Sequence, residues 1–252
     1  MPIDYTVDRT HGVRGDQMAR LTLQGQRSGL RDLAYRSIRD AIVKMEIAPG
    51  ERITEESLSD QLGVSRPVLR ESLQRLQVEQ LIDRLDNGRL RVRPATTEDV
   101  VHLYSVRSAL EQLAVREAGV HMSAKHLADL SAAIEQMHDA ETYDPRTVTE
   151  GGAQFHHKLA EIAGNPVNDL LMQQIRGPID RFRHLSVTLS ARPHHSVEEH
   201  EAILAALTEN NIDAAATAMH QHIMSGRDAV LEAIKSLAAE GHPGVTDGLA
   251  VV

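Results

Sequence analysis

The chain has 252 residues and a formal net charge of −9, and 41% of its residues are hydrophobic while only 2% are aromatic. This length predicts one large domain or two ordinary ones, and the aliphatic composition favours helices over sheets. The absence of Cys excludes disulfides and thiolate metal sites. No apolar run is long enough to cross a membrane, so we expect a cytoplasmic protein with no membrane partner.

The charged residues are unevenly distributed along the chain. Residues 28–94 carry 12 basic and 11 acidic side chains, whereas residues 95–252 carry 11 basic and 22 acidic ones. A near-neutral segment joined to an acidic one predicts two domains with different partners. Residues 1–27 show no hydrophobic periodicity, and we expect them to form a flexible arm.

Two helices are predicted at the start of the first domain. Apolar residues recur at helical spacing over Leu30–Met45, and Arg36 lies off this stripe. A turn at residues 47–50 ends the helix. Thr54 is suited to cap a second helix that runs to Leu62, because its side-chain oxygen can accept a backbone N–H. The apolar stripe of the first helix consists of Ala34, Ile38, Ala41, Ile42 and Met45.

A helix end, a tight turn and a new helix are predicted between Leu62 and Leu73. Gly63 can adopt the left-handed conformation that ends a helix, and the Ser65 hydroxyl can cap the next one. Pro67 falls in the first turn of that helix, where a missing backbone N–H costs little. This arrangement is typical of a helix-turn-helix.

The third predicted helix has two different faces. Leu69, Leu73 and Leu76 recur at helical spacing and indicate a core-facing side. Arg66 and Arg70 lie one turn apart on another side, at the front of the helix. Two guanidiniums placed this way suit phosphates and guanine edges in a DNA major groove. For the segment in isolation, a solvated amphipathic helix is the alternative interpretation.

A β-hairpin is predicted after the third helix. The dipeptide Asn87-Gly88 separates two short apolar runs, which is a strong hairpin signal. From Arg89 onward, arginines alternate with apolar residues, so one edge of the hairpin carries positive charge. Such an edge suits the DNA backbone. Three helices and this hairpin predict a winged helix-turn-helix over residues 28–94.

The rest of the chain is predicted to be helical. After a break at residues 94–95, further breaks near 120–123, 143–145, 164–166, 191–193 and 209–211 divide it into about six helices. These predict an all-α bundle over residues 95–240. The last residues, 241–252, are expected to form a flexible tail. The fold class is therefore mostly α.

Two sets of residues resemble known families. Ile47-Ala48-Pro49-Gly50, Gly63-Val64-Ser65-Arg66 and Arg70-Glu71-Ser72-Leu73 resemble the DNA-binding domain of GntR-family transcription regulators. The C-terminal part resembles the FCD ligand-binding domain of that family's FadR branch. The residues that carry this second resemblance are Leu103-Tyr104, Arg107, Leu110-Glu111, Phe155-His156, Ala163-Gly164-Asn165-Pro166, Glu199-His200 and His222.

The resemblance implies a ligand-responsive repressor of a metabolic operon, acting as a homodimer on double-stranded operator DNA. It departs from the family at Pro67-Val68, where Thr-Pro is usual, so Pro67 replaces a hydroxyl that often contacts DNA. The residues expected to contact DNA are Arg36, Thr54, Ser65, Arg66, Pro67, Arg70, Asn87, Gly88 and Arg89.

The resemblance also implies a metal site formed by His156, His200 and His222 on three helices. Three neutral imidazoles would suit Zn²⁺, Ni²⁺ or Mn²⁺. The family's fourth ligand is an Asp one turn before the first His, and this chain has Gly152 there. We therefore expect a weakened site that water or an anionic effector completes. From the residues alone, unrelated core or surface histidines are the alternative.

Arg107 is at the position of the family's inward-facing arginine. A guanidinium inside a bundle needs an anionic partner. Glu111, one turn later, could be that partner, or the carboxylate of a small organic acid effector could. Arg181 and Arg183 are weaker candidates for the same role.

Two other functions fit parts of the pattern. A three-His metal site with an open position resembles that of a metal-dependent hydrolase. Against it, no Glu or Asp stands at a motif position as general base, so we expect no enzymatic activity. A constitutive DNA-binding protein with a vestigial pocket is the second alternative, and the expected roles of Arg107 and the three histidines weigh against it.

Overall fold

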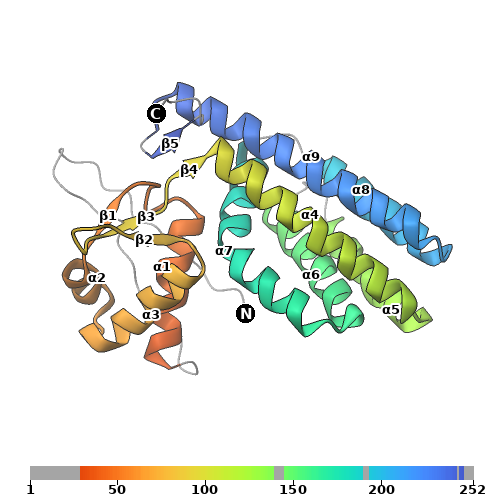
Figure 1. Ribbon diagram of the computed structural model, residues 1–252, viewed down its shortest axis with the longest axis horizontal. Helices are drawn as coiled ribbons and strands as arrows, with labels where there is room; N and C mark the ends of the chain where they lie inside the picture. Colours follow the sequence, from red (N-terminus) through yellow and green to blue (C-terminus); the bar gives the residue numbers. More distant parts are fainter. Residues whose placement is uncertain (1–28, 139–144, 190–192, 243, 247–252) are drawn as a thin grey trace.

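The structure is a computed structural model that describes residues 29–138, 145–189, 193–242 and 244–246 (Figure 1). The expected arm at residues 1–27 and the end of the expected tail lie outside these residues. Within the described part, nine helices and two small sheets form an N-terminal unit (residues 30–92) and a C-terminal unit (residues 95–246). The predicted mostly helical fold class is confirmed.

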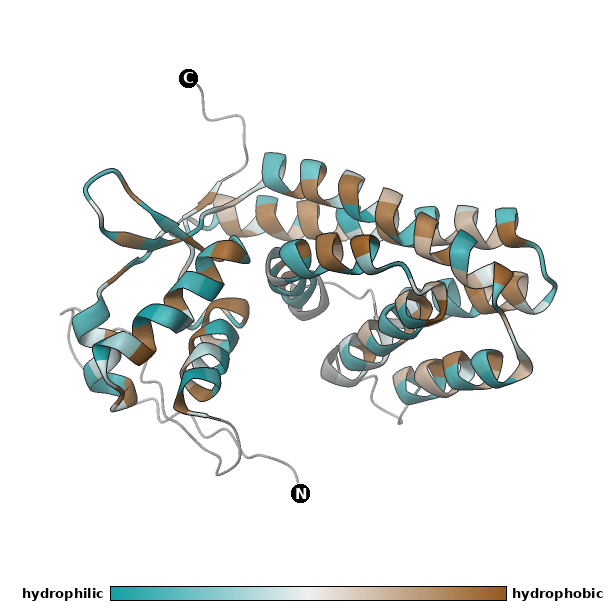
Figure 2. Ribbon diagram, turned by 60° about the horizontal axis from the view of Figure 1, so that its bottom comes forward, coloured by the Kyte–Doolittle hydropathy of each residue, from teal (hydrophilic) through white to brown (hydrophobic). Residues whose placement is uncertain are grey.

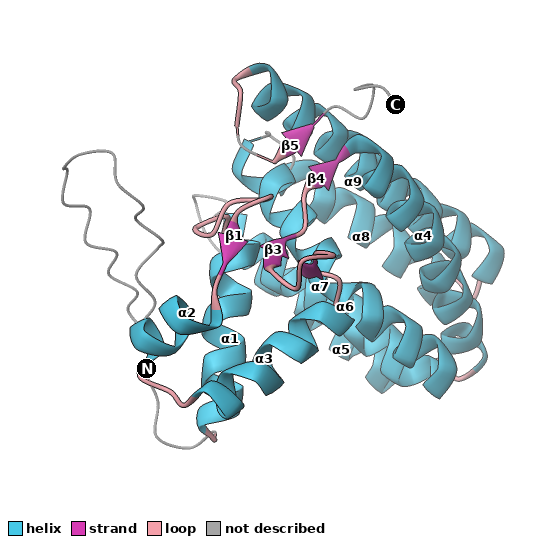
Figure 3. Cartoon of the chain, turned by 60° about the vertical axis from the view of Figure 1, so that its left-hand side comes forward, coloured by secondary structure: helices cyan, strands magenta, loops and turns pink. Residues whose placement is uncertain are grey.

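The N-terminal unit contains three helices and a three-stranded antiparallel sheet in the order β1-β3-β2 (Figure 3). Strands β2 and β3 form the predicted hairpin, and β1 extends it. The strand β1 was not predicted, because two residues are too short to show an alternating pattern. The elements are α1 (Leu30–Val43), β1 (Arg52–Ile53), α2 (Glu55–Leu62), α3 (Arg66–Val78), β2 (Ile82–Arg84) and β3 (Leu90–Val92).

Aliphatic side chains form the core of the N-terminal unit. Leu69, Leu73 and Leu76 of α3 are buried, as their spacing predicts, and belong to one core with Ala34, Ile38, Ala41 and Ile42 of α1 and with residues of β2 and β3. Met45, the last residue of the predicted stripe, instead packs against the core of the C-terminal unit. Most helices carry hydrophobic residues on one side and hydrophilic residues on the other (Figure 2). This burial orients α3 so that its polar side stays at the surface.

The helix ends in this unit agree with the predictions at two positions and differ at two. Gly63 has φ +63°, and the Thr54 hydroxyl oxygen accepts the Ser57 N–H at 3.2 Å. Ser65 precedes α3, but its side chain makes no capping hydrogen bond. Helix α1 ends at Val43 rather than Met45, because Met45 adopts a left-handed conformation with φ +60°.

The C-terminal unit is a bundle of six helices, with α4 and α9 running side by side along much of their length (Figure 1). The helix ends agree with the predicted breaks, although residues 139–144 and 190–192 lie outside the described part. None of the described helices is long and apolar enough to cross a membrane. The elements are β4 (Ala95–Thr96), α4 (Thr97–Val120), α5 (Ala124–Met137), α6 (Pro145–Ala163), α7 (Pro166–Leu189), α8 (Pro193–Thr208), α9 (Ile212–Ala239) and β5 (Val245–Thr246).

Residues 244–246 of the expected flexible tail (residues 241–252) lie within the described part of the chain. These residues return to the junction between the two units, where β5 pairs in parallel with β4. The Ala95 N–H donates to the Gly244 carbonyl at 3.0 Å, and the Val245 side chain is buried in the core of the bundle. Burial of Val245 and this pairing hold the segment in place.

Candidate metal centre and nucleic-acid interface

The arginines at the front of α3 are exposed and lie against the acidic first turn of α2. Arg66 pairs with Glu56 at 3.3 Å, and Arg70 pairs with Glu55 at 2.7 Å. Both arginine side chains are about 60% exposed. Exposed ion pairs of this kind are weak, so phosphates can replace the acids as partners.

All nine residues expected to contact DNA are exposed in the N-terminal unit. At the hairpin tip, the Asn87 side chain accepts the Arg89 N–H at 3.1 Å, so it stabilises the turn. Gly88 has φ +77°, a conformation that favours glycine. Farther along the hairpin, Arg91 is half-buried and pairs with Asp83 at 3.2 Å, so it is not directed freely outward as expected.

The structure brings His156, His200 and His222 together inside the bundle. They come from α6, α8 and α9, all three side chains are buried, and one nitrogen from each ring lies within 4.8 Å of the others. The Nε2 atoms of His156 and His222 are 3.3 Å apart. The predicted placement on three helices therefore produces one compact cluster.

Each ring in this cluster is oriented through its Nδ1 atom. His156 Nδ1 faces Glu111 at 2.9 Å, His222 Nδ1 faces Glu199 at 2.7 Å, and His200 Nδ1 faces a main-chain carbonyl at 2.6 Å. Because these oxygens only accept hydrogen bonds, each Nδ1 carries the proton and each Nε2 carries a lone pair. Hydrogen bonds of this kind orient metal-binding histidines in proteins.

The three Nε2 lone pairs converge on one another. His200 Nε2 is buried and has no hydrogen-bond partner among the described residues. Burial also lowers the pKa of His156 and of His200, which favours the neutral rings that a metal requires. The donor set therefore fits Zn²⁺ or a similar divalent ion.

Gly152 lies one turn before His156 and faces the cluster. A Cβ atom added there would meet His200 Nε2 and Cε1 at 3.5 Å, which is ordinary van der Waals contact. The position therefore has room for a side chain directed at the imidazoles, but glycine supplies no oxygen ligand. The cation-binding group found among the described residues consists of the three histidines alone.

Arg107 is buried beside the same cluster. Its Nε donates to Glu111 at 3.4 Å, and its Nη2 lies 3.5 Å from His156 Nε2. Burial alone would raise the pKa of Glu111, but the hydrogen-bonded His156 ring and the Arg107 charge outweigh it and lower that pKa. Glu111, one of the two partners that the sequence left open for Arg107, thus contacts it, and Arg107 lies beside the histidine cluster.

The two weaker arginine candidates differ in position. Arg181 is buried away from the histidines and donates to main-chain carbonyls of Arg93 and Pro94. Arg183 lies close enough to Arg107 and Glu111 for its charge to act on both. Arg181 is therefore engaged by the main chain at the junction, whereas Arg183 interacts electrostatically with groups at the histidine cluster.

Of the three groups that orient the rings, only Glu111 was singled out from the sequence, as a possible partner of Arg107. Glu199 was noted only as part of the Glu199-His200 resemblance, and the main-chain carbonyl of Ser196 carries no residue-type signal. Of Glu199 and the Ser196 carbonyl, Glu199 was the easier to find from the sequence, because a carboxylate next to a metal-binding His often orients another ligand.

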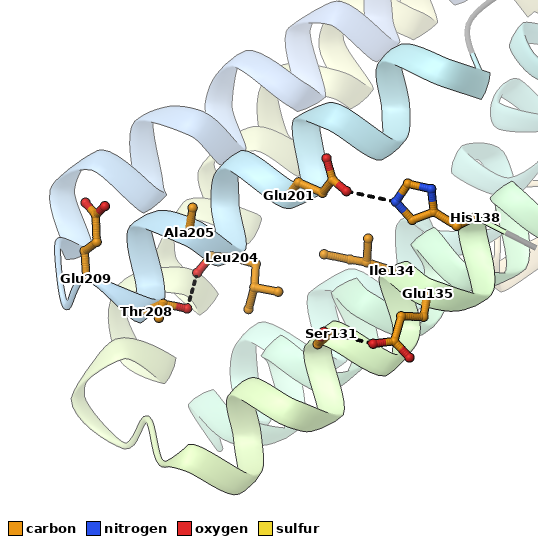
Figure 4. Close-up of a pocket in the computed structure, with 9 residues that line it drawn as sticks. All are labelled: Ser131, Ile134, Glu135, His138, Glu201, Leu204, Ala205, Thr208 and Glu209. Carbon is orange, nitrogen blue, oxygen red and sulfur yellow. Dashed lines mark hydrogen bonds and ion pairs between the residues drawn. The ribbon is translucent and has the colours of Figure 1, made fainter.

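A separate surface pocket of about 460 Å³ lies between α5 and α8 (Figure 4). Its rim carries the His138–Glu201 pair, with 2.8 Å between Nε2 and Oε1. None of the predicted site residues lines it. The lining residues are Ser131, Ile134, Glu135, His138, Glu201, Leu204, Ala205, Thr208 and Glu209.

The comparisons with known proteins agree with both parts of this structure. The family of bacterial regulatory proteins called gntR matches residues 30–92, and the FCD domain matches residues 102–225. The Nta operon transcriptional regulator of Aminobacter aminovorans is 29% identical over 198 residues, covering 79% of this chain and 93% of the relative. The transcriptional repressor RspR of Escherichia coli is 26% identical over 205 residues, covering 78% and 86%.

A solved structure shares the fold. The structure of E. coli McbR/YncC has a TM-score of 0.70 at 18% sequence identity and covers 81% of this chain and 98% of that one. The winged helix-turn-helix and the helical bundle define a DNA-binding regulator with a ligand-binding domain. The chain belongs to the GntR family of transcription regulators and carries an FCD domain.

Proposed function

We propose that this chain is a cytoplasmic, homodimeric repressor whose FCD domain senses a small carboxylate through a bound divalent metal. The observation that carries the proposal is the convergence of three Nε2 atoms beside the buried Arg107 guanidinium. GntR regulators bind operator DNA, and FCD domains bind small effectors. The relative named as a repressor supports the same mode of action for this chain.

His156, His200 and His222 would hold the metal. With Gly152 in place of an oxygen ligand, the protein supplies three neutral donors and no anionic ligand. A carboxylate effector would restore the charge balance at the ion. The metal would supply an electrophilic contact for a carboxylate oxygen, and Arg107 would donate hydrogen bonds to the same effector.

A hydrolytic role has little support from the site. Two carboxylates contact the cluster: the oxygens of Glu111 face Arg107 and His156, and Glu199 faces His222 Nδ1. A general base must reach a water or substrate proton, and both carboxylates are already engaged by these partners. The regulator is therefore the function that the geometry supports best.

Metal binding is tested by elemental analysis of the purified protein and by thermal melting with and without a chelator. We expect Zn²⁺ to raise the melting temperature and the chelator to reverse it. His200→Ala should abolish the shift, whereas His138→Ala, at the separate surface pocket, should leave it unchanged. Absence of metal and of any chelator effect would show that the cluster only lines the effector pocket.

DNA binding is tested with a genomic fragment that the protein itself selects. We expect a short imperfect palindrome, and the Arg66→Ala/Arg70→Ala variant should lose about 1–3 kcal/mol for each base or phosphate contact removed. Arg227→Ala, on α9, is the control. Equal affinity of the wild type and the double variant at fixed salt would contradict the assignment of α3 as the recognition helix.

The dimer interface is proposed on the exposed side of α4 and α7, which lie next to each other in the bundle. Val106, Leu113 and Val120 recur every seven residues on α4 and are 50%, 40% and 78% exposed, and Leu170 and Leu171 add exposed apolar surface on α7. A two-fold operator requires a two-fold protein.

The dimer proposal is tested by light scattering at micromolar concentration. Leu113→Asp should produce monomers, while Leu30→Asp, at an exposed apolar position on α1, should leave the dimer intact. A wild-type protein that is monomeric with and without DNA would contradict the proposal.

A further inference from the structure

One turn of α7, from Asp180 to Arg183, contacts three different parts of the molecule. Arg181 is 1% exposed and fastens this turn to the junction between the units, because its guanidinium donates to the carbonyls of Arg93 at 2.6 Å and Pro94 at 3.2 Å. Pro178 lies just before the turn and removes one backbone hydrogen bond of the helix. This turn of α7 is therefore tied directly to the junction.

Asp180 joins this turn to the DNA-binding domain. Its carboxylate pairs with Arg39 of α1, and Arg39 also pairs with Glu79 at 3.3 Å, directly after α3. The Tyr35 hydroxyl donates to the same Glu79 carboxylate. Arg39 and Asp180 are only 18% and 27% exposed, so solvent screens this pair less than an ion pair on the open surface.

Asp180 also lies near a second arginine, whose charge acts on the histidine cluster. Its second oxygen lies 3.9 Å from Arg183, one turn along the same helix. Burial and the Arg107 charge lower the pKa of Arg183, and Asp180 and Glu111 oppose that shift. The Arg183 charge also acts on His156 and His200. Arg183 therefore responds to the charge in the pocket while it is attracted by Asp180.

We propose that Asp180 couples the charge in the effector pocket to the DNA-binding domain, because it is shared between Arg39 and Arg183. This inference rests on the proposed function in one respect, namely that the pocket binds a charged ligand. A cation on the histidines repels Arg183 toward Asp180 and weakens the pair with Arg39. An anion in the pocket attracts Arg183 and leaves Asp180 to Arg39.

The neighbouring contacts allow Asp180 to act as a switch rather than only as a structural ion pair. When Asp180 turns toward Arg183, Arg39 retains its partner Glu79, so the DNA-binding domain keeps its own fold. Arg181 holds the junction in both arrangements. What changes is the attachment of α1 to α7, and with it the orientation of the recognition helix.

The test uses thermodynamic linkage, with Zn²⁺ alone as the probe. Zn²⁺ affinity is measured for the free protein and for its complex with the selected DNA fragment. We expect the two affinities to differ at least about fivefold in the wild type. In Asp180→Asn and Arg39→Gln, Zn²⁺ affinity should persist but the difference should fall to about one. Asp169→Asn, at the other end of α7, should keep the wild-type difference.

Two results of the linkage experiment would overturn the inference. These are a wild-type protein that binds Zn²⁺ equally with and without DNA, and a difference that survives in Asp180→Asn. Failure of the wild type to bind Zn²⁺ would instead contradict the proposed metal site.

A measurement without any ligand then tests whether Arg39 and Arg183 are coupled through Asp180. Arg39→Gln and Arg183→Gln should change the melting temperature non-additively when Asp180 is present and additively in the Asp180→Asn background. Additive effects in both backgrounds would also overturn the inference.

Discussion

At the scale of single residues, two adjacent glycines of α6 differ in what they permit. A Cβ on Gly151 would lie 2.5 Å from Met137, inside the packed core. A Cβ on Gly152 would lie 3.5 Å from His200 Nε2, without a clash. Packing against α5 therefore accounts for the first glycine, whereas the second leaves a vacant ligand position beside the histidines.

We predict that Gly152→Asp raises Zn²⁺ affinity, because the new carboxylate would add an oxygen ligand and a negative charge to the three imidazoles. Competition titration against a coloured chelator measures this affinity. Gly152→Ala is the control, since either substitution removes a helical glycine that costs roughly 0.5–1 kcal/mol. Equal Zn²⁺ affinity of the Asp and Ala variants would show that the side chain does not reach the metal.

Tyr35 gives a prediction about alkaline pH. Burial and the neighbouring Glu79 carboxylate raise the pKa of its hydroxyl to about 12 from the ordinary 10.0. The folded state retains this proton more tightly than the unfolded state. The contribution of the protonated Tyr35 hydroxyl to the free energy of unfolding is therefore complete below pH 10 and is lost as the pH rises toward 12. Tyr35→Phe should remove this part of the alkaline destabilisation, as measured by melts across that range. In the wild type, the phenolate absorbance should include a step that titrates later than an ordinary tyrosine. This late step should be absent from Tyr35→Phe.

At the scale of elements, the positive charge on the proposed DNA-contacting surface of α2 and α3 is partly neutralised. Glu55 and Glu56 stabilise the start of α2 through the helix dipole, and they also pair with the arginines of α3. DNA phosphates must displace these acids. The acidic turn therefore lowers affinity for any DNA and raises the relative importance of contacts made to a particular sequence.

We predict that Glu55→Gln/Glu56→Gln tightens binding to unrelated DNA about two- to tenfold, because exposed ion pairs are worth less than about 1 kcal/mol each. The control is Glu209→Gln/Glu232→Gln, which changes the net charge equally on the other domain. Fluorescence anisotropy with a random duplex at fixed salt provides the measurement. The same gain in the control would mean that net charge alone sets the affinity.

The elements were largely predictable from the sequence, because each depends on local patterns. Helical spacing and turn residues gave α1 to α9 and the hairpin, and Gly63 ended α2 as expected. Strands β1, β4 and β5 were missed, since two residues show no period. The Asp180–Arg39 pair joins residues 141 positions apart, and nothing in a linear pattern records such a contact. For the histidines, spacing gave the helices but not their convergence, which required the resemblance.

At the scale of the whole molecule, β5 binds the C-terminal part of the chain to the junction between the domains. Gly244 has φ +68°, and a Cβ there would lie 1.9 Å from the Pro49 carbonyl oxygen of the DNA-binding domain. Gly241 has a similar φ of +75° and open space around it. The two glycines therefore share a backbone requirement, but only Gly244 also makes a close approach to the other domain.

We predict that Gly244→Ala detaches β5 and that Gly241→Ala does not. Both variants carry the strain of a left-handed alanine, so any excess loss of melting temperature in Gly244→Ala reports the lost contact. Limited proteolysis at residues 93–96 should become faster in Gly244→Ala alone. Identical melting and cleavage in the two variants would show that the contact with Pro49 contributes nothing.

The pairing of β4 with β5 also has a consequence for synthesis on the ribosome. Val245 pairs with Ala95, so the partner of the junction strand is made 150 residues after it. At ordinary bacterial rates of about 5–20 residues per second, this interval lasts about 8–30 s. During that time the winged helix can fold and meet DNA while its junction lacks this strand partner. Newly made chains thus acquire the complete attachment between the DNA-binding domain and the bundle only after Val245 has been synthesised.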